Sequence, residues 1–142
     1  MAATEFAFCD FTSLIKYSIG MFKRLDESKN EQFTILFSDF SSYNSSDITE
    51  CVKQIPRDSD AIFHYGKYYF FILTSTNHSG AAVINEIFES FFNTEVKSSN
   101  VCFPLDGNDE EELLEELRVK TKKILNIDLE CLDRKILNKI HD

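Results

Sequence analysis

The stretch from Asp60 to Leu73 constrains the fold of this chain more than any other. It consists of two apolar, aromatic-rich runs that are separated only by Gly66 and Lys67. A two-residue loop with glycine first is typical of a type II′ β-hairpin turn. The second run, 68–73, has no polar face, which is typical of a central strand covered on both sides. The sequence therefore predicts a hairpin with one strand deep in the fold and its turn at the rim of a sheet.

Length and charge predict one domain that binds neither nucleic acid nor membrane. A chain of 142 residues is most simply a single domain, 1–142, that buries about two-thirds of its unfolded surface. The net charge of −9 lacks the basic footprint that nucleic acids and anionic membranes require. No apolar run approaches the roughly 18 residues of a membrane span, and no basic segment followed by an apolar run opens the chain. We expect a cytoplasmic protein.

Cysteine and histidine spacing predicts neither a disulfide framework nor a metal site. The cysteines are scattered and form no CxxC pair: Cys9, Cys51, Cys102 and Cys131. They could form two bridges, but neither their spacing nor the chain length requires them, so we expect reduced, buried thiols. The histidines show no metal-ligand spacing with these cysteines: His64, His78 and His141. We expect no metal and no cofactor.

Apolar periodicity and capping residues predict alternating helices and strands. The expected elements are a helix over 13–26 capped by Thr12 or Ser13, a strand over 33–39, a brief helix over 46–55 that Pro56 ends, hairpin strands over 60–65 and 68–74, a helix over 82–91, a strand over 95–103, a helix that Asp109 caps and a last helix over 126–142. Without the terminal helices, this is the split βαβ, or ferredoxin-like, order of an α+β fold. Its first and third strands are central antiparallel neighbours, which places Asp39 beside Lys67–Tyr69.

The helix that begins after Asp109 has an ordered charge pattern. Its first turn is acidic, with Glu110, Glu111 and Glu112, and its later turns carry several lysines. This order complements the helix macrodipole, and the simplest interpretation is a solvated helix face.

Four segments, in matching order, resemble a GGDEF domain, the family of bacterial diguanylate cyclases. Phe11–Leu14 resembles the LTGL that opens the family's first helix, and Leu36–Phe40 resembles the strand that ends in a metal-binding Asp. Arg57–Asp60 and His64–Phe70 resemble the RxxD and RYGGDEF motifs. Phe103–Asp109, with Leu113 and Leu114, resembles the YPxDGxDxxxLL segment. The resemblance covers a core over about 12–125. It implies the palm-type ferredoxin-like sheet of nucleotidyl cyclases, with extra helices at both ends.

The same resemblance implies that the catalytic chemistry is lost. Family members join two GTP molecules by phosphoryl transfer on Mg²⁺, which prefers hard oxygen ligands such as carboxylates. Asp39 remains, but the GGDEF signature reads Gly66-Lys67-Tyr68-Tyr69-Phe70. The loop after Asp39 lacks the family's guanine-recognising segment, and the family's late lysine falls near Leu125, with Lys122 and Lys123 off-position. We therefore expect no enzyme activity, and Asp39 as a turn residue at a strand end.

One ligand-type pair is retained, Arg57 and Asp60. In the family, RxxD forms an inhibitory site for cyclic di-GMP, where the arginine holds phosphate or a guanine edge and the carboxylate accepts from guanine N–H groups. His64 stands where the family has a further arginine. The alternative interpretation is a surface Arg–Asp pair worth at most about 1 kcal/mol. A cyclic di-GMP receptor using Arg57, Asp60 and His64 is thus the alternative function.

The tyrosines of the hairpin turn, Tyr65, Tyr68 and Tyr69, have two interpretations. They either pack a small sheet or form a patch for protein contacts, because tyrosines contribute much of the energy of interfaces. The candidate interface is the former active-site rim: Asp39, Gly66, Lys67, Tyr68 and Tyr69. The leading prediction is a catalytically inactive GGDEF-like signalling module. It acts through contacts that the rim and the terminal helices make with a protein partner or with a second copy.

Overall fold

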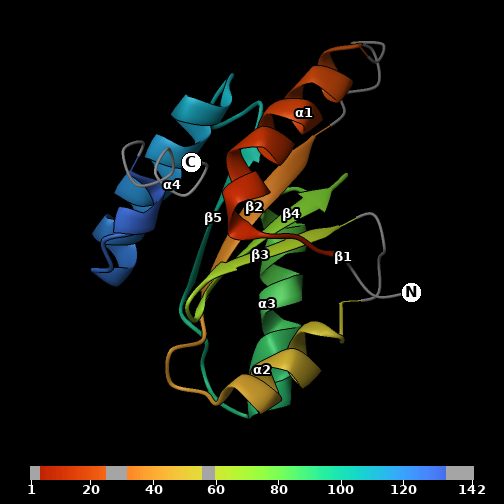
Figure 1. The fold of residues 1–142 in the computed structure, drawn as a ribbon. Helices are drawn as coiled ribbons and strands as arrows, with labels where there is room; N and C mark the ends of the chain where they lie inside the picture. Colours follow the sequence, from red (N-terminus) through yellow and green to blue (C-terminus); the bar gives the residue numbers. More distant parts are fainter. Residues whose placement is uncertain (1–3, 25–31, 56–59, 134–142) are drawn as a thin grey trace.

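The computed structural model describes residues 4–24, 32–55 and 60–133. These residues form a five-stranded sheet in the order β1-β3-β4-β2-β5 (Figure 1). Its strands are β1 (Thr4–Glu5), β2 (Phe33–Asp39), β3 (Ala61–Tyr65), β4 (Tyr68–Thr74) and β5 (Ser98–Phe103). β1 pairs with β3 in parallel, and the other neighbours are antiparallel.

The predicted hairpin is confirmed. Tyr65 pairs with Tyr68 at the end of β3 and β4, so Gly66 and Lys67 form a two-residue loop. Gly66 has φ +62°, as the first position of a type II′ turn requires. β4 lies between β3 and β2, and its residues 70–73 are buried on both faces of the sheet. The prediction that the all-apolar run 68–73 forms the central strand of the sheet is therefore confirmed.

Helices cover both faces of the sheet (Figure 1). α1 (Phe11–Arg24) and α4 (Glu110–Leu125) pack on one face, and α2 (Ser45–Val52) and α3 (His78–Phe92) pack on the other. The first core is rich in phenylalanine and contains, among others, Phe8, Phe11, Phe33, Phe37, Phe63, Phe70 and Phe103. Because aromatic rings bury large areas, these residues account for much of the stability of the α1–α4 side.

The ferredoxin-like order is confirmed. Apart from β1, the strands follow the order β3-β4-β2-β5, with α2 and α3 as the crossovers. α1 precedes this unit and α4 follows it, as expected for an α+β fold with additional terminal helices. β2 and β4 are antiparallel neighbours, and Asp39 pairs with Tyr68. In the described residues, no helix has the length and apolar character needed to cross a bilayer.

Several element boundaries differ from the prediction, mainly at caps. α1 begins at Phe11, directly after a 3-10 turn over Phe8–Asp10, so Thr12 lies inside the helix and is not its cap. Burial of the Phe11 ring, which is 0% exposed, fixes this earlier start. α2 and α3 begin after Asn44 and Asn77, whose side chains accept hydrogen bonds from the backbone N–H groups of Asp47 and Gly80, respectively.

The C-terminal segment 126–142 was predicted to be a helix. α4 ends at Leu125, and Asn126 has the left-handed φ of +58° that terminates helices. The described part beyond it contains only a 3-10 turn, η3 (Glu130–Leu132), which packs into the core through Leu129, Cys131 and Leu132. The start of the predicted helix is therefore wrong, and its residues 134–142 lie outside the described part of the chain.

Candidate functional site

The candidate site lies where the end of β2 meets the start of β4. The Phe40 N–H donates to the Lys67 carbonyl at 3.0 Å, which joins the loop after β2 to the hairpin turn. The Ser41 N–H donates to Asp39 Oδ1 at 3.0 Å. A carboxylate that accepts from the backbone two residues on closes an Asx-turn. Asp39 is thus placed beside the hairpin, as predicted, and it initiates the turn that leaves the strand.

Lys67 is held by the loop that follows β2. Its Nζ donates to the Tyr43 carbonyl at 2.5 Å. The Tyr43 ring stacks on Phe92 of α3, with 3.8 Å between centroids and 9° between planes. Burial and then the nearby Asp39 carboxylate raise the pKa of Tyr43. The loop 40–44 therefore packs against α3. The Lys67 ammonium group reaches from the hairpin turn to this loop and binds it.

Tyr68 and Tyr69 point to opposite faces of the sheet and are both half-buried. Tyr68 packs edge-on against Phe37, and Tyr69 packs against Phe40, with centroid distances of 5.4 and 5.1 Å. Burial, and then Asp39, raise the pKa of Tyr68, while burial raises the pKa of Tyr69. Both phenols therefore stay protonated at neutral pH. Tyr65 is the exposed tyrosine of the turn, at 47%.

The candidate receptor residues Asp60 and His64 lie at opposite ends of β3. The His64 ring contacts two oxygens, with Nδ1 3.0 Å from the Gly66 carbonyl and Nε2 3.2 Å from a Glu5 carboxylate oxygen. It also stacks on Tyr69, with 4.9 Å between centroids. His64 thus connects β1 to the hairpin turn.

Asp60 has a structural position at the start of β3. Its side chain is buried, with 1% of the residue exposed, and Oδ1 accepts from the Thr74 N–H at 3.1 Å and the Thr74 hydroxyl at 3.3 Å. Its carbonyl accepts from the N–H of Thr4 in β1 at 3.1 Å. Asp60 therefore fastens three strands together. Arg57 lies outside the described residues, so the RxxD site stays a prediction.

The rim residues do not fit a Mg²⁺ site of the kind the resemblance implies. Mg²⁺ takes octahedral oxygen ligands, usually with carboxylates among them. Asp39 supplies a carboxylate, but the neighbouring signature positions supply an ammonium at Lys67 and protonated phenols at Tyr68 and Tyr69. Within the described ranges, no group of three or more His, Cys, Asp or Glu side chains is arranged to hold a metal ion.

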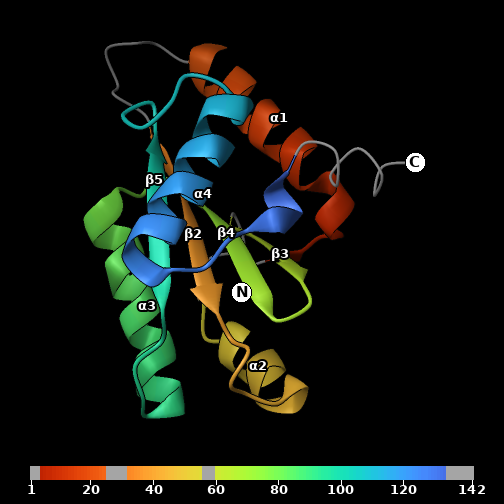
Figure 2. The ribbon, with the colours of Figure 1, turned by 90° about the vertical axis from the view of Figure 1, so that its left-hand side faces the viewer.

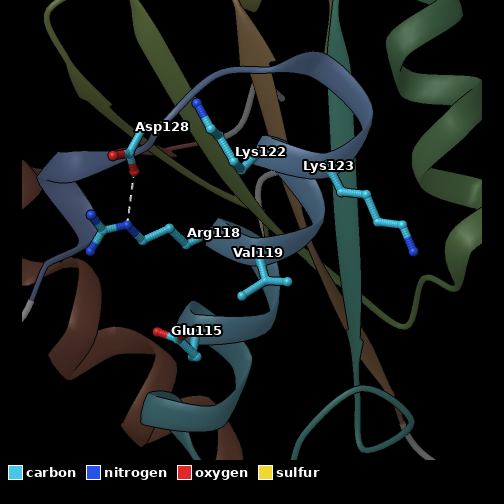
Figure 3. Close-up of a pocket in the computed structure, with 6 residues that line it drawn as sticks. All are labelled: Glu115, Arg118, Val119, Lys122, Lys123 and Asp128. Carbon is cyan, nitrogen blue, oxygen red and sulfur yellow. Dashed lines mark hydrogen bonds and ion pairs between the residues drawn. The ribbon is translucent and has the colours of Figure 1, made fainter.

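The lysines near the expected catalytic-lysine position lie on the outer surface of α4. A shallow hollow of about 370 Å³ there is lined by Glu115, Arg118, Val119, Lys122, Lys123 and Asp128. Figure 3 shows Arg118 turned toward Asp128, while Lys122 and Lys123 point in different directions. The two lysines therefore do not converge on one point in this hollow.

A polar cluster that the sequence did not single out covers the free edge of β5. His78 Nε2 lies 3.0 Å from Asp106 Oδ2, which also accepts from the Cys102 N–H at 2.8 Å. The Cys102 carbonyl accepts from the Asp106 N–H at 2.7 Å, and Lys120 Nζ donates to the Asn100 carbonyl at 2.7 Å. These bonds occupy outward-facing backbone groups of an edge strand and block the addition of another strand. In the sequence, Asp106 stood out only as part of the segment Phe103–Asp109 that resembles YPxDGxDxxxLL.

The four cysteines are free, and three of them are buried, whereas Cys9 is partly exposed. Burial raises the pKa of Cys51 and of Cys131 to about 12. Thiols with such pKa values carry almost no thiolate at neutral pH and are poor nucleophiles. The predicted reduced state holds in the structure, and burial holds for all but Cys9.

The strand order, the central hairpin and the helices on both faces define the fold as that of a GGDEF domain. No family model matches the sequence, and no curated protein matches it significantly. Among solved structures, a DGC protein from Thermotoga maritima aligns with a TM-score of 0.56 at 16% identity, over 79% of this chain and 92% of that one. The GGDEF domain of YfiN (TpbB) from Pseudomonas aeruginosa aligns with a TM-score of 0.59 at 13% identity, over 82% and 89%. The resemblance read from the sequence is therefore confirmed at the level of the fold.

Proposed function

We propose that this chain is a catalytically inactive, GGDEF-like signalling module that acts through contacts with other proteins. The observation that supports this most is the state of the rim, where Lys67 is bound to the Tyr43 carbonyl. In the family, this position belongs to a glycine that admits phosphate to the backbone. Here a long cationic side chain crosses that surface, and the loop beneath it is closed by the stacking of Tyr43 on Phe92.

Phosphoryl transfer depends on metal ions that bridge the phosphates and neutralise their charge. The rim offers Asp39 for this purpose, with phenols that stay protonated at Tyr68 and Tyr69. The ammonium group of Lys67, which donates to the Tyr43 carbonyl, supplies no metal ligand. Loss of the metal ligands and loss of space for phosphate thus support the same proposal, and both follow from residues 66–69.

The rim is instead suited to contacts with a protein. Tyrosine combines a large apolar ring with a hydroxyl, and it is enriched among the residues that dominate interface energies. Tyr65 is exposed, and its cross-strand partner Tyr68 is half-exposed on the same face. Tyr69 is half-exposed on the opposite face of the sheet. In place of the signature carboxylates, the end of the hairpin thus presents tyrosines on both faces of the sheet.

We expect the double substitution Tyr68→Ser/Tyr69→Ser to abolish capture of a protein partner. A pull-down with immobilised protein, read by mass spectrometry, measures this. Tyr17→Ser is the matched control, because Tyr17 is 66% exposed on α1, away from the rim. Equal capture by the wild type and the rim variant, with both folded by circular dichroism, would rule out the rim as the interface.

We expect no binding of cyclic di-GMP. The alternative receptor function needs the Asp60 carboxylate to accept from the ligand, but this carboxylate is buried and already accepts from Thr74. Isothermal titration calorimetry of the wild-type chain, with ligand up to high micromolar concentration, should give only heats of dilution. Saturable heat that Arg57→Ala removes would establish the receptor function instead.

A further inference from the structure

The outward face of α4 carries charges that are arranged symmetrically about one apolar residue. Val119 is 50% exposed at the middle of this face. Glu115 and Glu116 precede it by four and three residues, and Lys122 and Lys123 follow it by three and four. Residues at these spacings share one side of a helix. The face therefore carries two acidic groups before an apolar centre and two basic groups after it. Glu112, seven residues before Val119, is a further exposed acidic group on the same side.

The four charged residues of this face are exposed and have no ion pair within the described part of the chain: Glu115, Glu116, Lys122 and Lys123. The cations beside them on α4 are used internally. Arg118 pairs with Asp128 at 3.0 Å and with Asp133 at 3.3 Å, and Lys120 donates to a backbone carbonyl. These four residues and Val119 form a charged stripe whose side chains are free to contact a partner.

The stripe is accessible. Figure 2 shows α4 in front of the sheet, and no other labelled element covers its outer side. Figure 3 shows Val119 between Glu115 on one side and the two lysines on the other, along the shallow hollow of about 370 Å³. A second helix can therefore approach this side without displacing a described element.

We propose that a second copy of this chain docks antiparallel on α4, with Val119 at the two-fold axis. In that arrangement Glu115 and Glu116 of one copy lie beside Lys122 and Lys123 of the other, and the symmetry repeats the contact. A parallel pair would place like charges together. The chain as a whole has a charge of −9 and repels its copies, so the complementary pairs made by these four charges favour both the partner and its orientation.

The contact is weak and depends on protein concentration. A single helix pair buries less than the roughly 1,000 Å² of a stable interface. Exposed ion pairs contribute little binding energy, although they fix the orientation of the two copies. The stripe does not include the rim, so this proposal goes beyond the proposed function. A failure of either leaves the other unchanged.

Charge reversal tests the antiparallel arrangement. Glu115→Lys/Glu116→Lys makes the stripe basic, and Lys122→Glu/Lys123→Glu makes it acidic. Sedimentation equilibrium should show concentration-dependent dimers of the wild type and at least about tenfold weaker association of each variant alone. An equimolar mixture of the two variants should regain wild-type association, because every pair is then complementary. A mixture that stays monomeric while the wild type dimerises would overturn the proposal.

A cross-link tests the position of the axis. A residue on a two-fold axis faces its own copy, so Val119→Cys should form a covalent dimer under mild oxidation. Val83→Cys is the matched control, since Val83 is 54% exposed on α3 at the other face of the sheet. The wild type reports the background of the native cysteines. A wild type that is monomeric at high micromolar concentration, with no excess of covalent dimer for Val119→Cys over Val83→Cys, would contradict the proposal.

Discussion

Replacing Phe70 by alanine is expected to lower the free energy of unfolding by about 3–5 kcal/mol, a large part of the total of about 5–15 kcal/mol for a domain. Phe70 is 0% exposed in β4. Its ring lies between those of Phe8, Phe11 and Phe37, with centroid distances of 5.7, 5.1 and 5.4 Å. The substitution removes one ring from the centre of this cluster and leaves a cavity that neighbouring aromatic rings cannot fill.

Urea denaturation followed by circular dichroism measures this loss. Phe91→Ala is the matched control, because Phe91 is 40% exposed on α3. It should cost less than about 1 kcal/mol, as most surface substitutions do. If Phe70→Ala and Phe91→Ala lowered the midpoint equally, the placement of β4 at the centre of the sheet would be wrong.

Replacing Asp60 by alanine is expected to cost about 1–3 kcal/mol, because a donor at the end of β4 loses its acceptor. The carboxylate accepts from the N–H and the hydroxyl of Thr74 while it is almost fully buried. Asp60→Asn is the matched variant, since its amide oxygen can still accept from the Thr74 N–H. We expect Asn to retain more stability than Ala in the same urea titration.

The outcome for Asp60 also decides how ligand assays are designed. A destabilised Asp60→Ala chain would lose ligand heat through unfolding, so Arg57→Ala is the better variant for calorimetry. An Asp60→Ala chain as stable as the wild type would show that the carboxylate does not fasten β3 to β4. Asp60 would then be better explained by a ligand role.

The sheet could be predicted from the sequence because its signals are local and strong. A glycine-first, two-residue turn between apolar runs defines the hairpin, and the all-apolar run 68–73 marks the central strand. The split βαβ order then follows from the order of elements, and it places Asp39 opposite Tyr68. The helix capped by Asp109 was also predicted correctly, because its acidic first turn and capping residue agree.

Helix starts could not be predicted as well, because tertiary contacts decide among several polar residues. Thr12 and Ser13 are good caps, but burial of Phe11 begins α1 before them. Asn44 and Asn77 lay in stretches that contain many possible caps.

The candidate site was predicted in position but not in detail. The register of β2 and β4 places Asp39 beside the hairpin turn, and this follows from the sequence. The bond from Lys67 to the Tyr43 carbonyl depends on the path of the loop after β2, which no local pattern of residues predicts. The burial of Asp60 was also missed, because an aspartate before a strand is usually exposed.

The most direct test of the central proposal is incubation of the purified chain with GTP and Mg²⁺, followed by chromatographic separation of the guanine nucleotides. We expect no cyclic di-GMP above a blank without protein, because Lys67 and the two phenols replace the groups that would hold metal and phosphate. Formation of cyclic di-GMP by the wild type, lost in Asp39→Asn, would contradict the account.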